Sequence, residues 1–168
     1  EVAAAPDDAG EGGGVPAGRD YSWYVRRGDE RLERGDVPRA RALYEAARAV
    51  RPGGSEALTG LGYVALESGD TSGAASRFRR AAGQGYADAY IGLGTAYRQL
   101  GRTRDALTAY ERYLERLPNG PRASIARRQA DELRRRLDDE SPGAPAAGDA
   151  PAEPAGAQER GPRRADEE

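Results

Sequence analysis

Apolar side chains recur at helical spacing between residues 20 and 140, and short breaks marked by glycine separate the helical stretches. Asp36 and Asp70 each follow a glycine and precede a new stretch, which is the position of a helix N-cap. Thr103 is the candidate cap of a third stretch. Sustained alternation of apolar and polar residues with a period of two does not occur. The pattern therefore predicts an all-α domain over 20–140.

The helical stretches repeat one another three times, at intervals of 34 and 32 residues. The first glycine of each copy would let one helix approach its partner, and the second would end that helix with a positive φ. A small alanine would lie where the paired helices cross, with an aromatic side chain in the groove beside it. The matching positions are Gly28, Gly62 and Gly94; Gly35, Gly69 and Gly101; Ala40, Ala74 and Ala106; and Tyr44, Phe78 and Tyr110.

These spaced positions resemble the tetratricopeptide repeat, whose unit is a helix–turn–helix of about 34 residues. The resemblance covers three units, 21–54, 55–86 and 87–120. It implies a right-handed α-solenoid that binds other proteins. The second unit is two residues short between Ala81 and Gly94, so its second helix or the following loop should be shortened.

A further helix is predicted over 121–139, where Ala126, Ala130, Leu133 and Leu137 form one apolar stripe. The terminal unit of a repeat array has no neighbour to bury its apolar face, so a polar-faced helix there would act as a cap. A coiled-coil dimer helix is the alternative, but the stripe is short and rich in alanine, which argues against it.

The two ends differ in composition from the middle of the chain. Residues 1–19 form an acidic, glycine-rich arm or linker, and residues 141–168 are rich in proline and alanine. Such segments bury too little apolar surface to offset the entropy of ordering them, so we expect disordered tails. The chain begins with Glu1 and has no methionine, from which we expect a processed product or an excised fragment.

All 26 basic residues are arginine, which is typical of a GC-rich bacterial genome. No apolar run is long enough to span a bilayer. The chain has no cysteine, so disulfides cannot indicate the compartment. The sequence does not separate a cytoplasmic protein from an exported, periplasmic one.

Most residues that carry enzyme chemistry are missing, because the chain has no histidine, cysteine or lysine. It therefore lacks an imidazole acid or base, a thiolate nucleophile, a Schiff-base amine and the usual zinc ligands. The Gly-Leu-Gly sequences at 60–62 and 92–94 fall inside repeat helices, so close helix packing explains them better than a nucleotide loop. The arginines alternate with acids and form no coherent basic face for nucleic acid. We expect no enzyme, no cofactor, no metal and no nucleic-acid partner.

In the tetratricopeptide repeat family, the first helices of successive units line a concave groove. The resemblance therefore implies a peptide or protein partner, held by a stripe at i, i+4, i+7 and i+8 of each first helix. Tyr63 is central in this stripe and is the expected hot spot. The expected groove residues are Val25, Asp29, Leu32, Thr59, Tyr63, Leu66, Ile91, Thr95, Arg98 and Gln99, with Glu33 and Glu67 at the ends of the first two helices.

One subclass of the family clamps the C-terminal carboxylate of a peptide with lysine, asparagine and arginine. Val25 and Asp29 stand at the corresponding positions of the first unit, and Asp29 would repel a carboxylate. We therefore expect a different kind of peptide. The alternative function is a structural spacer or self-assembly module within a larger protein, which the linker-like ends suggest.

Overall fold

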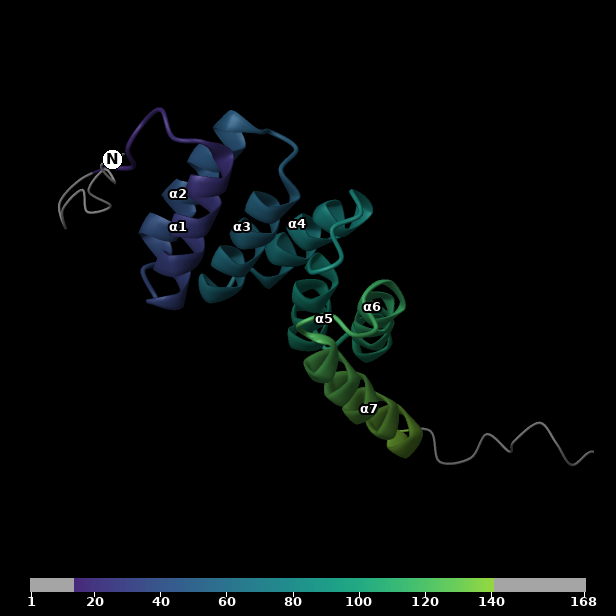
Figure 1. The fold of residues 1–168 in the computed structure, drawn as a ribbon. Coiled ribbons are helices and arrows are strands. Elements are labelled where there is room, and N and C mark those ends of the chain that lie inside the picture. Colours follow the sequence, from purple (N-terminus) through teal and green to yellow (C-terminus); the bar gives the residue numbers. More distant parts are fainter. Residues whose placement is uncertain (1–13, 141–168) are drawn as a thin grey trace, which may run out of the picture.

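The computed structural model describes residues 14–140, which form seven helices without a strand (Figure 1). The all-α helical-repeat solenoid expected from the sequence is confirmed. The remainder of the expected arm and the expected tail, 1–13 and 141–168, lie outside the described residues. The helices are α1 (Tyr21–Glu33), α2 (Val37–Val50), α3 (Ser55–Glu67), α4 (Thr71–Gly83), α5 (Ala89–Gln99), α6 (Thr103–Arg116) and α7 (Ala123–Glu140).

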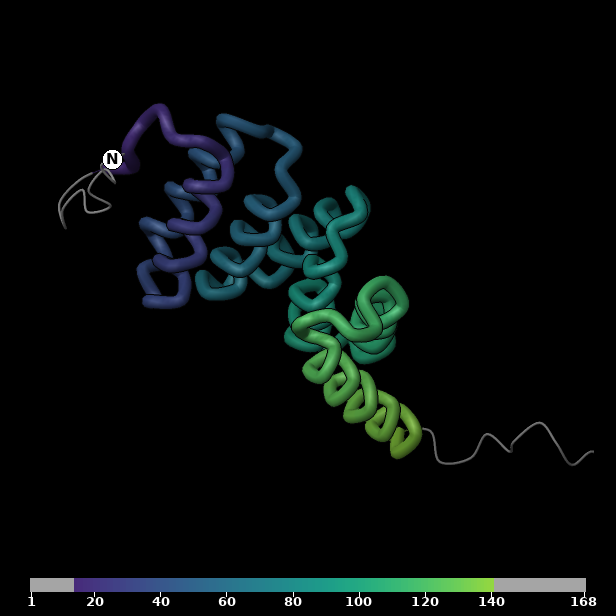
Figure 2. The backbone as a smooth tube through the Cα atoms, viewed as in Figure 1, coloured from purple at the N-terminus to yellow at the C-terminus, as the bar shows by residue number. Residues whose placement is uncertain are grey.

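Each helix packs on the next one along the chain, as the continuous tube of Figure 2 shows. Helices α1, α3 and α5 are the first helices of the three units, and they also contact one another in the order α1, α3, α5. Helices α2, α4 and α6 are the second helices. Two layers result, and the layer of first helices carries the candidate site.

Aspartate starts several of the helices by accepting a hydrogen bond from a backbone N–H of the first turn. Asp36 accepts from the N–H of Arg39 at 3.3 Å, and Asp70 accepts from the N–H of Gly73 at 2.8 Å, which confirms both predicted caps. The prediction for Thr103 is wrong.

Thr103 is the first residue of α6, and the N-cap position belongs to Arg102. No side chain caps α6. The Arg102 side chain instead forms an ion pair with Asp105 of the first turn at 2.6 Å and stacks on the ring of Tyr97. These side-chain contacts connect the start of α6 to α5.

Glycine ends the first helix of every unit in the left-handed region, where a Cβ would be strained. Gly35, Gly69 and Gly101 have φ angles of 74°, 80° and 70°. The predicted helix stop is therefore present three times, at the same place in each repeat.

One aromatic residue of each second helix, at the repeated position of Tyr44, Phe78 and Tyr110, lies against glycine in the first helices. A Cβ on Gly28 would come within 2.6 Å of the Tyr44 ring, and a Cβ on Gly60 would also collide with that ring. Phe78 lies in the same way against Gly62 and Gly92. The Gly-Leu-Gly sequence of α3 thus lets two aromatic side chains approach one helix closely, Tyr44 from the preceding unit and Phe78 from its own unit, as close packing required.

The shortened unit changes the turn between α4 and α5. Gly85 has a φ of 91°, and the backbone N–H of Tyr86 donates to the Ala81 carbonyl at 3.2 Å. Helix α5 begins at Ala89 and spans 11 residues, against 13 in α1 and in α3. Residues 86–88 therefore lie in a turn beside the start of α5 instead of in the helix.

Helix α7 covers the end of the array. Ala123, Ala126, Ala130 and Leu133 are buried against Tyr110 and Tyr113 of α6. Tyr113 of α6 faces this helix, and its hydroxyl accepts a hydrogen bond from the backbone N–H of Arg122 at 3.1 Å. Apart from the exposed Ile125, arginines and acids make up most of the remaining surface of α7, as a polar-faced cap requires.

At the other end of the array, residues 14–19 lie against α1. Val15 packs on the cluster that contains Tyr21 and Tyr24, and the Tyr24 hydroxyl donates to the Pro16 carbonyl at 2.6 Å. Trp23 packs on the same cluster with its ring edge-on to Tyr24, and Arg19 lies over the Trp23 ring. Trp23 thus belongs to the packing of this end of the array.

Candidate interaction face

The side shared by α1, α3 and α5 is called the inner face here, and most of the expected groove residues belong to it by their register. Asp29 and Arg98 are exposed, while Val25, Tyr63 and Thr95 are half-buried. These five residues leave part of their side chains open to a partner.

The other expected groove residues take part in packing. Thr59 and Ile91 are only 6% and 7% exposed. Leu32 and Leu66 lie against core clusters. The Gln99 side-chain oxygen accepts a hydrogen bond from Thr71 of α4 at 3.2 Å. Thr59 and Ile91 are therefore largely covered, whereas Leu32 and Leu66 are half-buried and Gln99 is exposed.

Tyr63 links distant parts of the array. Its ring lies edge-on to Phe78 at 5.0 Å, and its hydroxyl accepts a hydrogen bond from the Arg122 guanidinium at 3.0 Å. Burial raises the pKa of Tyr63, and the charge of Arg122 opposes part of that rise. Arg122 directly precedes α7, so this contact joins the end of the array to its second unit.

Charged and phenolic groups from four parts of the chain, α1, α3, the turn before α5 and the residue before α7, influence one another around this contact. Burial, and then the charges of Asp88 and Glu56, raise the pKa of Tyr86 to about 12. Burial lowers the pKa of Arg122, but Tyr63 and Asp88 outweigh that effect and the pKa is raised. The groups that interact here, named the inner-face cluster, are Asp29, Glu56, Tyr63, Tyr86, Asp88 and Arg122.

Asp29 binds the second helix of its own unit. Its carboxylate accepts a hydrogen bond from the Tyr44 hydroxyl at 2.7 Å, and Tyr44 is fully buried. Partial burial raises the pKa of Asp29, although the hydrogen bond from Tyr44 lowers it, and the charge of Glu33 adds to the rise. Tyr110 repeats the arrangement in the third unit, where its hydroxyl lies 3.3 Å from that of Thr95.

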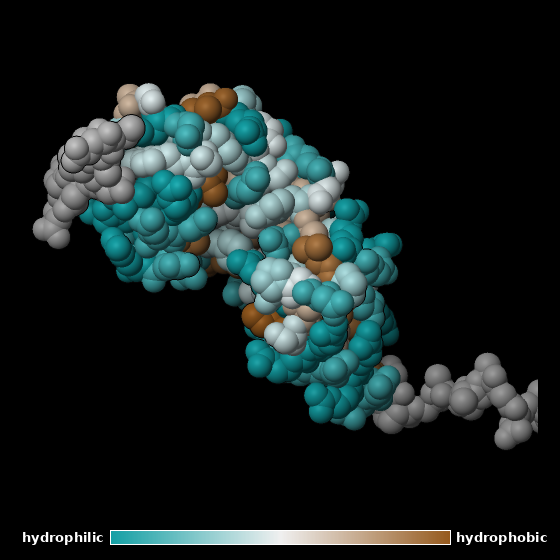
Figure 3. Space-filling model, in the orientation of Figure 1, coloured by the Kyte–Doolittle hydropathy of each residue, from teal (hydrophilic) through white to brown (hydrophobic). Residues whose placement is uncertain are grey.

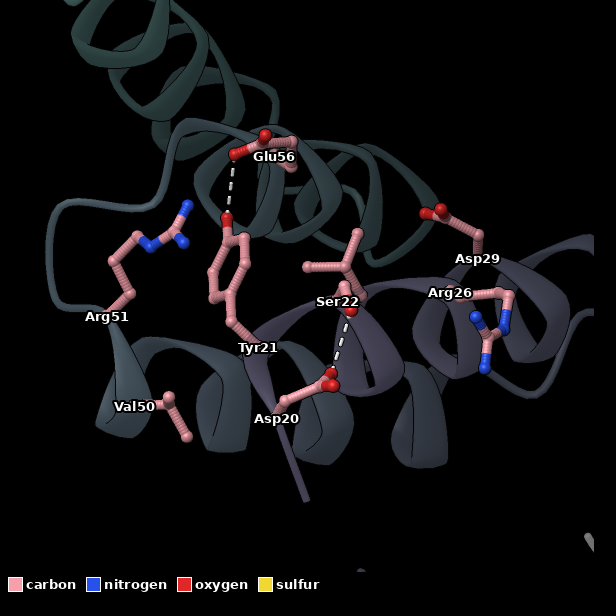
Figure 4. A pocket seen from close by; sticks show the side chains of 9 residues that line it. Asp20, Tyr21, Ser22, Arg26, Asp29, Val50, Arg51 and Glu56 are labelled. Carbon is pink, nitrogen blue, oxygen red and sulfur yellow. Dashed lines mark hydrogen bonds between the residues drawn. The ribbon is translucent and has the colours of Figure 1, made fainter. Parts of the chain in front are cut away.

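An open pocket of about 700 Å³ lies at the N-terminal end of the inner face (Figure 4). The Tyr21 hydroxyl donates to Glu56 at 2.8 Å across the pocket, and Arg51 lies over the Tyr21 ring. In Figure 4 the Asp29 carboxylate and the Arg26 guanidinium point in different directions. The lining residues are Asp20, Tyr21, Ser22, Val25, Arg26, Asp29, Val50, Arg51 and Glu56.

Sequence reasoning missed four members of the inner-face cluster, and a signal for three of them was present. Glu56, Asp88 and Arg122 follow Ser22 at intervals of 34, 32 and 34 residues, which are the intervals of the repeat. By the same register Ile125 and Gln129 of α7 correspond to Val25 and Asp29. Helix α7 therefore continues the inner face as a fourth first helix, besides acting as a cap. Tyr86 could not be found in this way, because it lies in the shortened turn.

Apolar atoms are scattered in small spots on the face shown in Figure 3. Within residues 14–140, no group of three or more acidic side chains is arranged to hold a metal ion. In the same part of the chain, every helix is too short or too polar to cross a bilayer. The chemistry of this surface consists of carboxylates, phenols and guanidinium groups.

The paired helices, the buried aromatic rings and the capped end define a helical-repeat protein. The sequence profile of the tetratricopeptide repeat family matches residues 25–90, 60–121 and 91–138. The chain belongs to the tetratricopeptide repeat family. The last match includes α7, in agreement with its register as a fourth first helix.

Solved structures share the fold at low sequence identity. The Sgt2 TPR domain from Aspergillus fumigatus has a TM-score of 0.65 at 24% identity, covering 86% of this chain and 94% of that chain. The first TPR of Spaghetti (RPAP3), bound to the HSP90 peptide SRMEEVD, has a TM-score of 0.62 at 21% identity, with coverages of 70% and 93%. YrrB, a TPR protein with an unusual peptide-binding site, has a TM-score of 0.58 at 24% identity, with coverages of 72% and 63%. Among curated proteins, the comparison finds no match.

Proposed function

We propose that this protein is a non-catalytic scaffold that holds a peptide or protein segment against its inner face. The tetratricopeptide repeat is in general a protein-interaction fold, and two of the similar structures are described by the peptides or peptide site they contain. The observation that carries the proposal is the inner face itself. Half-buried apolar and polar side chains alternate there, and a pocket of about 700 Å³ opens beside them.

The ligand differs from an acidic C-terminal tail. Asp29 stands where a clamp for a carboxylate would need a donor, and Glu56 and Asp88 lie in the same cluster. The charge of Asp29 thus disfavours, at this position, the carboxylate that the clamp subclass of the family binds.

A peptide selection with matched variants tests the proposal. The full chain is immobilised, peptides are selected from a random display library, and affinities for two double variants are measured. Arg98→Glu with Ile125→Arg changes exposed residues of the inner face, and Arg79→Glu with Ala49→Arg makes the same charge changes at exposed residues of α4 and α2. We expect at least about tenfold weaker binding for the first pair only. Equal affinities of both pairs would contradict the proposal.

A further inference from the structure

The hydrogen bond between Arg122 and Tyr63 joins two parts of the inner face that are not neighbours in the array. Tyr63 lies in α3 and Arg122 directly precedes α7, so the bond skips α5, the first helix that stands between them in the series. The backbone of α7 packs on α6. These two side chains therefore provide a link between the end of the array and its second unit that helix packing does not provide.

Both partners of this bond are held in place by other contacts. The Tyr63 ring lies edge-on to the buried Phe78 ring, with 5.0 Å between their centres. The backbone N–H of Arg122 donates to the hydroxyl of the buried Tyr113 at 3.1 Å. Between these anchors, the Arg122 guanidinium donates to the Tyr63 hydroxyl at 3.0 Å and lies 6.0 Å from the centre of the Tyr63 ring. The contact thus connects the core of the second unit to the core of the third.

The contact is strong enough to set a conformational preference and weak enough to open. Tyr63 and Arg122 are both half-buried, so water can replace either partner. A hydrogen bond with a charged donor shifts an equilibrium by roughly ten- to a hundredfold, which favours one arrangement without making it permanent. A change of curvature would be absorbed by the turns before α5 and before α7, because the helices themselves are rigid.

We propose that Arg122 and Tyr63 form a strap that fixes the curvature of the array and, with it, the width of the inner face. When the strap is closed, the start of α7 is held towards α3. When it opens, α6 and α7 stay packed on each other and move away from α3 together, so the inner face widens. Small rotations between repeats add up, so one contact that spans two units acts on the whole array. This inference goes beyond the proposed function, and its test needs no ligand.

Distances between spin labels on the full chain test the strap. The chain has no cysteine, so Glu33→Cys and Glu132→Cys place labels at two exposed positions, one at the end of α1 and one in α7. Double electron–electron resonance measures the distribution of distances between the labels. We expect Tyr63→Phe and, separately, Arg122→Gln to lengthen the mean distance and broaden the distribution. Combining the two substitutions should cause no further change, because each removes the same contact.

Tyr97→Phe and Arg128→Gln are the matched controls. Tyr97 is another half-buried tyrosine of a first helix, and Arg128 is an exposed arginine of α7. Neither side chain belongs to the strap, so both controls should keep the wild-type distribution of distances. Circular dichroism checks that every variant is folded, and if one strap variant is unfolded, the other carries the test.

Hydrogen exchange distinguishes a strap from a contact that only stabilises the fold. Opening the strap should speed exchange of the α7 amides about tenfold and leave exchange in α1 and α2 at its wild-type rate. Unchanged distances in Tyr63→Phe and Arg122→Gln would overturn the inference, whether exchange stays the same or becomes faster in all helices. Equal lengthening in the control variants would overturn it as well.

Discussion

The side chains of Tyr44 and Phe78 explain why α3 has two glycines, Gly60 and Gly62, because one ring packs against each of them. Each ring lies between a glycine of its own unit and a glycine of the next unit. The aromatic side chain therefore sets the distance within a helix pair and also the distance between pairs. Both rings are fully buried, so neither can move aside into solvent.

Replacing Gly60 tests this packing. Gly60→Ala should lower the free energy of unfolding by about 1–3 kcal/mol, because the new Cβ would collide with the buried Tyr44 ring. Gly83→Ala is the matched control, since Gly83 is also helical but has open space around it. The control should be neutral or gain up to about 1 kcal/mol from helix propensity. Urea unfolding measures both, and equal effects would contradict the packing.

Asp29 gives a pH dependence whose sign follows from its raised pKa. The folded state holds the Asp29 proton more tightly than the unfolded state, so the contribution of Asp29 to stability is present below the ordinary value of 3.8 and is lost as pH rises through the folded pKa. Asp29→Asn cannot titrate but keeps an acceptor for Tyr44. Chemical unfolding at several pH values should show wild type losing stability relative to Asp29→Asn as pH rises across that window. The opposite trend would contradict the cause given for the shift.

Among the helices, different side-chain interactions stabilise the first turn. The α4 start depends on the Asp70 carboxylate, whereas α6 starts without a side-chain cap and Arg102 pairs with Asp105 at its surface. A cap satisfies a backbone donor that would otherwise lack a partner. An exposed ion pair only exchanges one solvated contact for another.

The Asp70 cap and the Arg102–Asp105 ion pair should contribute different amounts to the free energy of unfolding. Asp70→Ala should lower the free energy of unfolding by about 1 kcal/mol, and Asp105→Ala, with the Arg102 and Asp105 side chains both about half exposed, by less than about 0.5 kcal/mol. Thermal or urea unfolding distinguishes the two values. A larger loss for Asp105→Ala would show that the ion pair takes over the role of the missing cap.

Helix α7 stabilises the end of the array through one side only. Ala126 is fully buried against α6, whereas Arg128 two residues later is exposed. Ala126→Glu should cost more than about 3 kcal/mol, because it puts a charge without a partner among buried side chains. Arg128→Glu should change stability by less than about 0.5 kcal/mol. Urea unfolding with equal midpoints for both variants would contradict the packing of α7.

Arg122 and Tyr63 show what only the whole molecule determines. The two residues are 59 positions apart, and their hydrogen bond depends on how much each helix pair is rotated relative to the last. Small rotations add up along a repeat array. The shortened turn that carries Tyr86 alters one of these steps, so the position of Arg122 could not be predicted from spacing.

The sequence predicted much of the fold for a physical reason. Glycine, alanine and aromatic residues at fixed intervals report helix contacts that are local to one unit or to neighbouring units, and Gly62 with Phe78 is one such pair. Part of the candidate site was predicted as well, including Asp29 and Tyr63. Glu56, Asp88 and Arg122 were missed, because the stripe began one turn too late and α7 was read only as a cap.

Mapping backbone amide chemical shifts of the nitrogen-15-labelled chain with a library-selected peptide tests the central claim most directly. We expect the largest changes in α1, α3, α5 and the first turn of α7, with residues around Asp29, Tyr63 and Arg122 among them. The amides of α2, α4 and α6 should change little. Changes centred on α2, α4 and α6 would contradict an inner-face binding site.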